Sequence, residues 1–204
     1  MSDYVNRRVW LIGAGNMAVE YAKVFAAMKI EPVIVGRGQE SAQIFQDKTG
    51  MAVVCGGVDA FLQTGPDKPD AVIIAVNVVD LARTAASVMD YCQPKILLEK
   101  PGAITSADVN LLKACKGADR LFIAYNRRFF ASTQAVRKML EEDDGPVSCT
   151  FEFTEWAHRI SPVIGRKNPE EMKHWLIANS SHVIDLAFYL AGFPKKLDAT
   201  VEGA

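Results

Sequence analysis

The chain has 204 residues, of which 50% are apolar and 23% are charged, a composition ordinary for a folded globular protein. Its 23 Lys and Arg residues nearly balance its 24 Asp and Glu residues, which leaves no positive surplus for nucleic acid or an acidic membrane surface. No apolar run approaches the roughly 20 residues that cross a bilayer, and the first residues lack the apolar core of a signal peptide. We therefore expect a cytoplasmic protein that binds neither nucleic acid nor membrane.

Short apolar runs alternate with helical patterns through the first 124 residues. We expect each run to be a strand buried on both faces, because continuous apolar runs are typical of a parallel sheet covered by helices. The expected strands are 9–12, 32–35, 52–55, 71–76, 96–98 and 121–124. The alternation of strand and helix predicts a doubly wound α/β sheet with right-handed connections.

The pattern changes after residue 124. A helix is predicted over about 129–142, and the alternating segment 147–156 predicts a strand with one buried and one exposed face. Such strands are typical of antiparallel sheets. A second helix is expected over about 181–190, followed by an alternating strand that begins at 197–201.

The sequence therefore predicts two domains, a parallel α/β domain over 1–124 and a partial α+β domain with a mainly antiparallel sheet over 125–204. The second domain has few elements, and small cores are marginally stable. Either a second subunit or a longer chain would supply the missing strands. We expect a homodimer or larger oligomer formed through the C-terminal sheet.

A glycine-rich turn follows the first strand and opens the first helix. It runs from Gly13 to Ala18 and reads GAGNMA, the G-x-G-x-x-G/A pattern that binds dinucleotides in Rossmann folds. Gly13 permits the tight turn, and Gly15 leaves room for a diphosphate to approach the backbone. The free N–H groups at the helix start lie at the positive end of the helix dipole. The predicted cofactor-binding residues of this turn are Gly13, Gly15, Asn16 and Met17.

Arg37 lies at the end of the second strand, where an NAD site usually has an Asp or Glu that binds the ribose 2′-hydroxyl. A guanidinium matches a 2′-phosphate in charge and geometry. We therefore expect NADP rather than NAD as the cofactor. The alternative is that Arg37 is a solvated loop residue.

Three further segments resemble the glucose-fructose oxidoreductase / inositol dehydrogenase (Gfo/Idh/MocA) family when they are taken with the glycine turn. They read ILLEKP at 96–101, AYNRRF at 124–129 and SHVID at 181–185. The resemblance covers essentially the whole chain. It implies an N-terminal Rossmann domain, a C-terminal α/β domain on a large open sheet, and oxidation or reduction of a sugar, sugar nucleotide or cyclitol with NAD or NADP. The family's chains are usually longer, so this one looks truncated in its second domain.

Lys100 follows the fifth strand at the carboxyl edge of the sheet, where ligands bind in open α/β folds. Hydride transfer from a hydroxyl-bearing carbon needs a base for the hydroxyl proton. An ordinary lysine is too basic for this role, and burial together with the positive oxidised nicotinamide would lower its pKa. We predict that Lys100 is this base and that Glu99 orients it or binds a cofactor ribose. The alternative is a surface lysine before a turn proline.

The resemblance places the family's catalytic histidine at His182. Many relatives carry an aspartate at the position of Ala178, and the neighbouring Asn179 is able to hold a sugar hydroxyl but is a poor base. This departure moves the expected catalysis onto Lys100 and His182. A histidine beside an apolar helix is otherwise often structural.

The remaining expectations concern the substrate side of the site. By resemblance, Asn126 and Arg127 bind the substrate, a small carbohydrate-like molecule, together with Asn179 and His182. Asn77 is expected to contact the nicotinamide half of the cofactor. The histidines lack metal-ligand spacing, so no metal is expected. The alternative function is a non-catalytic NAD(P)-binding sensor or a partner subunit of an active enzyme.

Overall fold

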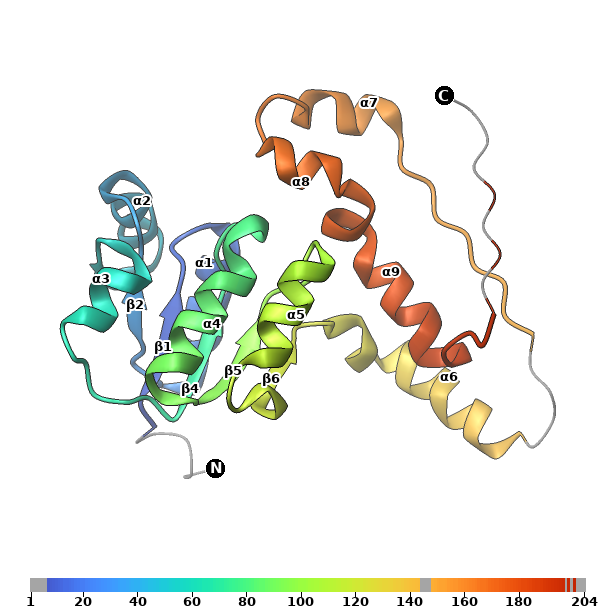
Figure 1. Ribbon diagram of the computed structural model, residues 1–204, viewed down its shortest axis with the longest axis horizontal. Coiled ribbons are helices and arrows are strands. Elements are labelled where there is room, and N and C mark those ends of the chain that lie inside the picture. The colour runs from blue at the N-terminus through green and yellow to red at the C-terminus, as the bar shows by residue number, and fades with distance from the viewer. Residues whose placement is uncertain (1–6, 144–147, 197, 199, 201–204) are drawn as a thin grey trace.

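A computed structural model of the chain describes residues 7–143, 148–196, 198 and 200 (Figure 1). Its first part is one parallel six-stranded sheet with the strand order β3-β2-β1-β4-β5-β6. This confirms the predicted doubly wound α/β fold. The strands are β1 (Val9–Ile12), β2 (Val33–Val35), β3 (Val53–Val54), β4 (Ala71–Ile74), β5 (Lys95–Leu98) and β6 (Leu121–Ile123).

Helices connect successive strands and cover both faces of the sheet (Figure 1). Thr105 and Asp108 form the capping box that opens α5, each side chain bonding the other's backbone N–H. Gly50 ends α2 in the left-handed conformation, with φ 73°. The connecting helices are α1 (Asn16–Met28), α2 (Gln39–Thr49), α3 (Gly57–Gln63), η1 (Val78–Asp80), α4 (Leu81–Cys92), α5 (Ser106–Ala114) and η2 (Ala118–Arg120).

Two apolar clusters hold this part together, one on each face of the sheet. Leu11 points into the cluster that contains the fully buried Phe45 of α2. Trp10 points to the other face, where its ring packs edge-on against Phe61 at 4.9 Å between ring centroids. The central strands are buried on both faces as predicted, but the outer strands are not: Phe122 on β6 is 55% exposed. An edge strand has a neighbour on one side only, which its apolar sequence does not reveal.

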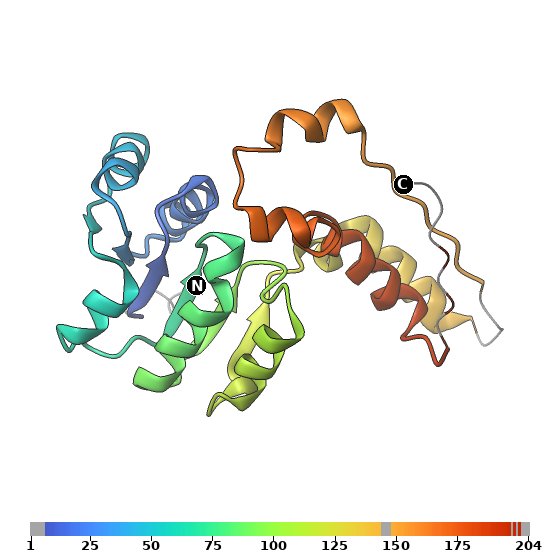
Figure 2. The same ribbon diagram turned by 45° about the horizontal axis from the view of Figure 1, so that its top comes forward.

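The second part of the described chain is helical. Helices α6 and α9 lie side by side (Figures 1 and 2). The predicted helix 129–142 is confirmed, and the predicted helix 181–190 is longer because it begins at Trp175. Among the described residues, no helix combines the length and apolarity that a membrane span requires. The elements are η3 (Asn126–Phe129), α6 (Ala131–Glu142), α7 (Ala157–Ile160), η4 (Ser161–Val163), α8 (Pro169–Lys173) and α9 (Trp175–Ala191).

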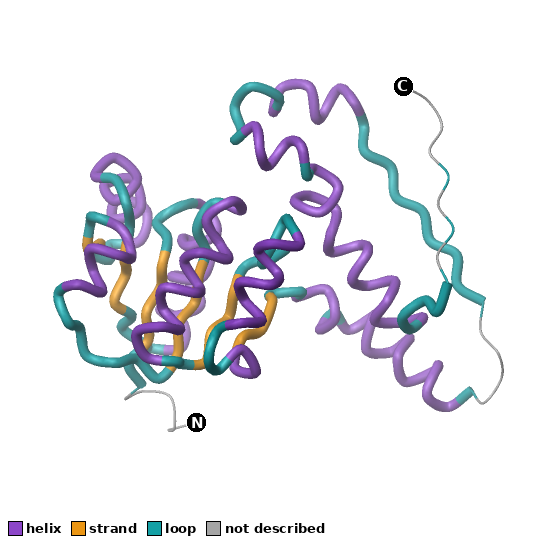
Figure 3. The backbone as a smooth tube through the Cα atoms, in the orientation of Figure 1, coloured by secondary structure: helices purple, strands orange, loops and turns teal. Residues whose placement is uncertain are grey.

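The predicted strand 147–156 is wrong for its described residues. Segment 148–156 is irregular, and Figure 3 shows strands only in the first part of the chain. A strand needs a neighbour that completes its backbone hydrogen bonds, and the described residues offer this segment none. In the other predicted strand, 197–201, residues 197, 199 and 201 lie outside the described residues. The expected antiparallel sheet therefore stays a prediction.

Candidate functional site

The glycine turn has the geometry that the sequence predicts. Gly13 has φ 126°, and a Cβ atom there would lie 2.2 Å from the carbonyl oxygen of Ala75. A Cβ on Gly15 would meet nothing within 4 Å, and no side chain caps the start of α1. Ala18 is fully buried, as close packing of helix and strand requires. The turn thus leaves the first backbone N–H groups of α1 free beside open space.

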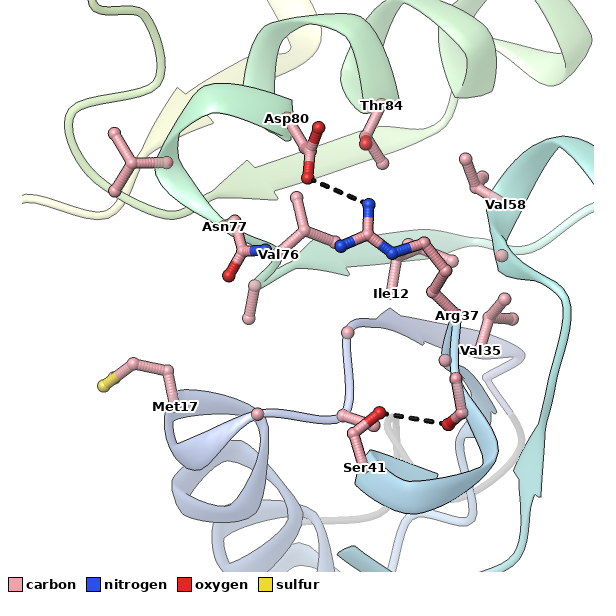
Figure 4. Close-up of a pocket in the computed structure, with 18 of the residues that line it drawn as sticks. Ile12, Met17, Val35, Arg37, Ser41, Val58, Val76, Asn77, Asp80 and Thr84 are labelled. Carbon is pink, nitrogen blue, oxygen red and sulfur yellow. Dashed lines mark hydrogen bonds and ion pairs between the residues drawn. The ribbon is translucent and has the colours of Figure 1, made fainter. Parts of the chain in front are cut away.

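That space belongs to a cavity of about 840 Å³ at the carboxyl ends of β1, β2 and β4 (Figure 4). Strand β1 lies between β2 and β4, so this is the point where the strand order reverses. Ligands of open α/β sheets bind at such points. Six residues predicted to bind the cofactor line the cavity: Gly13, Gly15, Asn16, Met17, Arg37 and Asn77.

Arg37 reaches across the cavity from the end of β2. Its guanidinium pairs with Asp80 of η1 at 3.4 Å, and both side chains remain partly exposed (Figure 4). Nearby, Arg83 pairs with Asp59 at 3.6 Å. Ser41 donates a hydrogen bond to the carbonyl of Gly38 at 3.0 Å. This end of the cavity therefore combines exposed cations with carboxylates.

The residues present fit a dinucleotide. The volume of the cavity lies in the range of sites that enclose small organic ligands. Free amides at the start of α1 match a diphosphate, and the bare Cα of Gly15 leaves that position open. Met17, which the apolar pattern of α1 would place in the core, is instead 50% exposed at the cavity wall.

Glu99 is fixed at the end of β5. Its carboxylate accepts a hydrogen bond from the Tyr21 hydroxyl at 2.6 Å and one from the backbone N–H of Lys100 at 3.3 Å. Burial raises the pKa of Tyr21, and the bond to Glu99 raises it further, so Tyr21 stays a proton donor. The peptide bond between Lys100 and Pro101 is cis.

The amine of Lys100 points to helix α9 rather than into the cavity lining. It donates hydrogen bonds to the carbonyl oxygens of Ala178 at 2.8 Å and Asn179 at 3.4 Å. Neither Glu99 nor Lys100 lines the cavity. The structure therefore brings Lys100 to the predicted Asn179, but through the backbone of Asn179 and not its amide side chain.

Charges from both parts of the chain act on Lys100. Burial lowers its pKa, and the nearby cations Lys167 and Arg127 lower it further. Glu99 and Glu171 act in the opposite direction. The net effect is a pKa below the ordinary 10.5, which makes the neutral amine more accessible than in a solvated lysine.

His182 lies in the same group of charges. Its ring meets Tyr125 edge-on at 5.8 Å between centroids, and its Nδ1 is buried without a hydrogen-bond partner in the described part of the chain. Burial lowers the pKa of His182, as do Lys100 and Arg127. The structure thus brings Lys100, Arg127 and His182 together. Among the described residues, no hydrogen bond joins the side chain of the exposed Asn126 to this group.

The downstream Asp185 has a structural partner. Arg128 binds both of its carboxylate oxygens, with Nε at 2.8 Å from Oδ2, and also lies 5.0 Å above the ring of Tyr189. This contact ties η3 to α9. It places the two arginines of the AYNRRF segment in different settings, because Arg128 is bound and Arg127 lies beside Lys100 and His182.

Three charged residues near the site were missed by sequence reasoning. Lys167 and Glu171 form an ion pair that lines the cavity. Glu155 accepts hydrogen bonds from Trp175 at 2.5 Å, from Ser180 at 2.6 Å and from the side chain of Asn179. Partial burial acts to raise the pKa of Glu155, but these bonds outweigh it and lower the pKa. The spacing of Lys167 and Glu171 was a helical signal, yet nothing in it indicated a cavity.

Metal ligation finds no support in the part of the chain that the structure describes. No group of three or more His, Cys, Asp or Glu side chains there is placed to hold an ion.

No family model matches the sequence, and no curated protein matches it. Several solved structures share its fold. The WlbA dehydrogenase from Bordetella pertussis, in complex with NADH and UDP-GlcNAcA, is 25% identical with a TM-score of 0.56, covering 67% of this chain and 42% of that one. An oxidoreductase from Agrobacterium radiobacter, in complex with NAD+, L-tartaric acid and magnesium, is 19% identical with a TM-score of 0.67. The match covers 91% of this chain and 55% of that one.

A putative myo-inositol dehydrogenase from Sinorhizobium meliloti is 20% identical with a TM-score of 0.63, covering 92% of this chain and 56% of that one. The chain spans about half the length of these proteins. It has the fold of dehydrogenases of the Gfo/Idh/MocA type, which confirms the resemblance seen in its motifs.

Proposed function

We propose that the protein is an NAD(P)-dependent oxidoreductase that transfers a hydride between nicotinamide and a hydroxyl or carbonyl group of a sugar, sugar nucleotide or cyclitol. The observation that carries the proposal is the cavity at the reversal of strand order, lined by the glycine turn. Solved structures of the same fold include dehydrogenases in complex with NADH and a nucleotide sugar. On this proposal, residues 125–204 belong to a substrate domain.

Lys100 and His182 are the groups that would move or hold protons. The bound nicotinamide would supply the hydride acceptor or donor. Lys100 would take the hydroxyl proton in oxidation and return it in reduction, and its lowered pKa favours this role near neutral pH. His182, whose own pKa is lowered, would stay neutral and position the substrate hydroxyl, with Arg127 beside it.

NADP is the cofactor we propose in preference to NAD. Arg37 lies at the end of β2, where the adenosine ribose binds in Rossmann folds. Its only ion pair in the described residues is the 3.4 Å contact with the partly exposed Asp80. A 2′-phosphate would offer Arg37 a doubly charged partner. Arg37→Gln should weaken NADPH binding about 10-fold or more and leave NADH binding nearly unchanged. Equal losses for both cofactors would contradict this assignment.

The first test of the function is cofactor binding, measured by NADPH fluorescence. Gly15→Val places a side chain in the open space beside the turn without a clash inside the protein. We expect an unchanged circular dichroism spectrum and loss of NADPH binding. A variant that bound NADPH as tightly as the unmodified protein would show that the cavity holds something else.

The second test is turnover, followed at 340 nm with a panel of sugars, uronic acids, sugar nucleotides and cyclitols. Lys100→Met should lower kcat by about 10²- to 10⁴-fold with the affinity for NADPH retained. Lys95→Met is the control, because Lys95 is an exposed lysine at the opposite end of the same strand. Full kcat in Lys100→Met would exclude Lys100 as the base.

One observation favours a second function, a non-catalytic dinucleotide-binding protein. Ala178 stands where many relatives have an aspartate, and its carbonyl holds the Lys100 amine at 2.8 Å. Tight NADPH binding without turnover on any member of the substrate panel would support this alternative.

A further inference from the structure

One wall of the cavity does not come from the Rossmann sheet. All lining residues but two precede residue 124; the exceptions are Lys167 and Glu171. They lie just before and within α8, which packs against η1 at the edge of the cavity. The helical part of the chain therefore contributes a charged surface to a site that the sheet otherwise forms.

The two residues pair a buried carboxylate with a more exposed lysine. Lys167 and Glu171 are joined by an ion pair, and the Glu171 residue is only 8% exposed. The Lys167 amine also lies 5.9 Å from the centre of the Trp175 ring, which limits its freedom. A buried carboxylate is costly unless it is paired, and Lys167 supplies that partner at the cavity wall.

The pair lies between η1, which α8 contacts, and Lys100 at the end of β5. Arg37 follows β2, next to the outermost strand β3, whereas α8 is on the side of β5 and α5 (Figures 1 and 2). The charges of Lys167 and Glu171 both act on Lys100, at the end of β5. Since the adenosine half of a dinucleotide would bind near Arg37 and the nicotinamide half toward Lys100, the pair would lie beside the nicotinamide half.

Three of the four carboxylates that line the cavity are paired with its three cations, and Glu40 is the fourth. Each lining cation is paired with a lining carboxylate: Arg37 with Asp80, Arg83 with Asp59, and Lys167 with Glu171. Backbone amides are then left to hold the diphosphate. An ionised carboxylate is the side chain that best accepts hydrogen bonds from ribose hydroxyls, and Rossmann sites use one for the adenosine ribose.

We propose that Glu171, held by Lys167, binds the ribose hydroxyls of the nicotinamide half of the cofactor, so that α8 completes the dinucleotide site. The inference rests on the proposed function, since it needs a dinucleotide in the cavity. Lys167 neutralises Glu171, which would otherwise repel the neighbouring diphosphate. The pair thereby links cofactor binding to the helical part of the chain.

Calorimetric titration with fragments tests this directly. The ligands are NADPH, ADP-ribose 2′-phosphate, which retains the second ribose, and 2′,5′-ADP, which lacks it; NADH, ADP-ribose and AMP form the parallel series. Glu171→Gln should weaken binding of the dinucleotide and of the matching ADP-ribose compound about 10-fold. It should change binding of 2′,5′-ADP or AMP, which lack the second ribose, by less than about 2-fold. Equal losses for all three ligands, or no loss, would overturn the inference.

The same helix supplies a matched control. Glu170 and Lys173 form an exposed ion pair at 2.6 Å, and neither lines the cavity. Glu170→Gln should therefore change the affinity for every ligand by less than 2-fold. A loss for NADPH as large as that in Glu171→Gln would show that α8 acts only through its general stability.

Variants of Lys167 separate a charge effect from misfolding. Lys167→Met leaves the Glu171 carboxylate uncompensated and should weaken NADPH binding. The double variant Lys167→Met/Glu171→Gln removes both charges, which buried pairs tolerate better than the loss of one partner. The double variant should fold, and it should bind NADPH more tightly than Lys167→Met alone. As in Glu171→Gln, its affinity should fall for the ligands that retain the second ribose and not for 2′,5′-ADP. Weaker NADPH binding than in Lys167→Met would contradict the inference.

The outcomes also distinguish this inference from the proposed function. If the unmodified protein binds neither NADPH nor NADH, the proposed function fails and the inference fails with it. If the unmodified protein binds a dinucleotide and Glu171→Gln binds the whole series equally well, only the inference fails.

Discussion

The two parts of the chain, residues 7–124 and the described residues beyond 124, are stabilised differently. Nearly all buried apolar side chains belong to the first part, in clusters on both faces of the sheet. Beyond residue 124, the described buried apolar residues are only Ala178 and Ala187. Large apolar side chains are exposed there instead, among them Phe129 at 80% and Phe193 at 84%.

Polar contacts hold the second part where apolar burial is thin. Arg128 binds Asp185 and lies over Tyr189, and Glu155 collects three hydrogen bonds from α9. The amine of Lys100 joins α9 to the sheet. The site is therefore bounded on one side by a sheet with a buried apolar core and on the other by a helix that polar contacts position.

The largest expected effect is the loss of unfolding free energy when a buried aromatic ring of the first part is removed, compared with an exposed ring of the second part. Phe45 is fully buried under α2, so Phe45→Ala should lower the free energy of unfolding by about 3–5 kcal/mol. Phe193→Ala should change it by no more than about 0.5 kcal/mol. Urea unfolding followed by circular dichroism measures both. A cost well above this for Phe193→Ala would contradict the difference between the two parts, because it would show that the Phe193 ring contributes to stability beyond its contact with Phe188.

An intermediate effect is expected from the tie between η3 and α9. Asp185 has a side chain only 10% exposed and binds Arg128. Asp185→Asn removes the charge that this bidentate contact needs and should cost about 1–3 kcal/mol of unfolding free energy. Lys138→Met, which removes an exposed ion pair with Glu142 on α6, is the control and should cost far less. If both variants lowered the free energy of unfolding equally, the contact between Arg128 and Asp185 would not be a dominant one in the second part.

The smallest expected effect is a shift in the pKa of His182, which tests the contact between the sheet and α9. The pKa of His182 is held below the ordinary 6.5 by burial and then by Lys100 and Arg127. As the pH falls through 6.5, the unfolded chain takes up this proton first, so His182 makes the fold less stable toward lower pH.

Lys100→Met should raise the pKa of His182 and weaken this loss of stability. NMR titration of the His182 ring measures the pKa, with Lys95→Met as a control that leaves it unchanged. An identical His182 pKa in Lys100→Met would place the two groups too far apart to act together.

The sequence predicted those features that depend on local pattern. Continuous apolar runs identified the strands, because a strand buried on both faces has no polar positions. The turn at Gly13 was predictable because its backbone conformation and close approach to Ala75 exclude any side chain. The start of α5 also depends on local sequence, since the reciprocal bonds of Thr105 and Asp108 span only a few residues. The candidate residues Lys100 and His182 came from motifs.

Other features depended on contacts between distant segments. Of the strand expected at 147–156, the described residues 148–156 form none, because strand geometry needs a neighbour and not only an alternating pattern. Lys100 binds carbonyl groups 78 and 79 residues away, and Lys167 and Glu171 reach the cavity from the helical part. Local sequence determined which segments form the sheet and its glycine turn. Only the tertiary structure decided which charges surround Lys100, since Coulomb interactions and burial depend on distance in space and not along the chain.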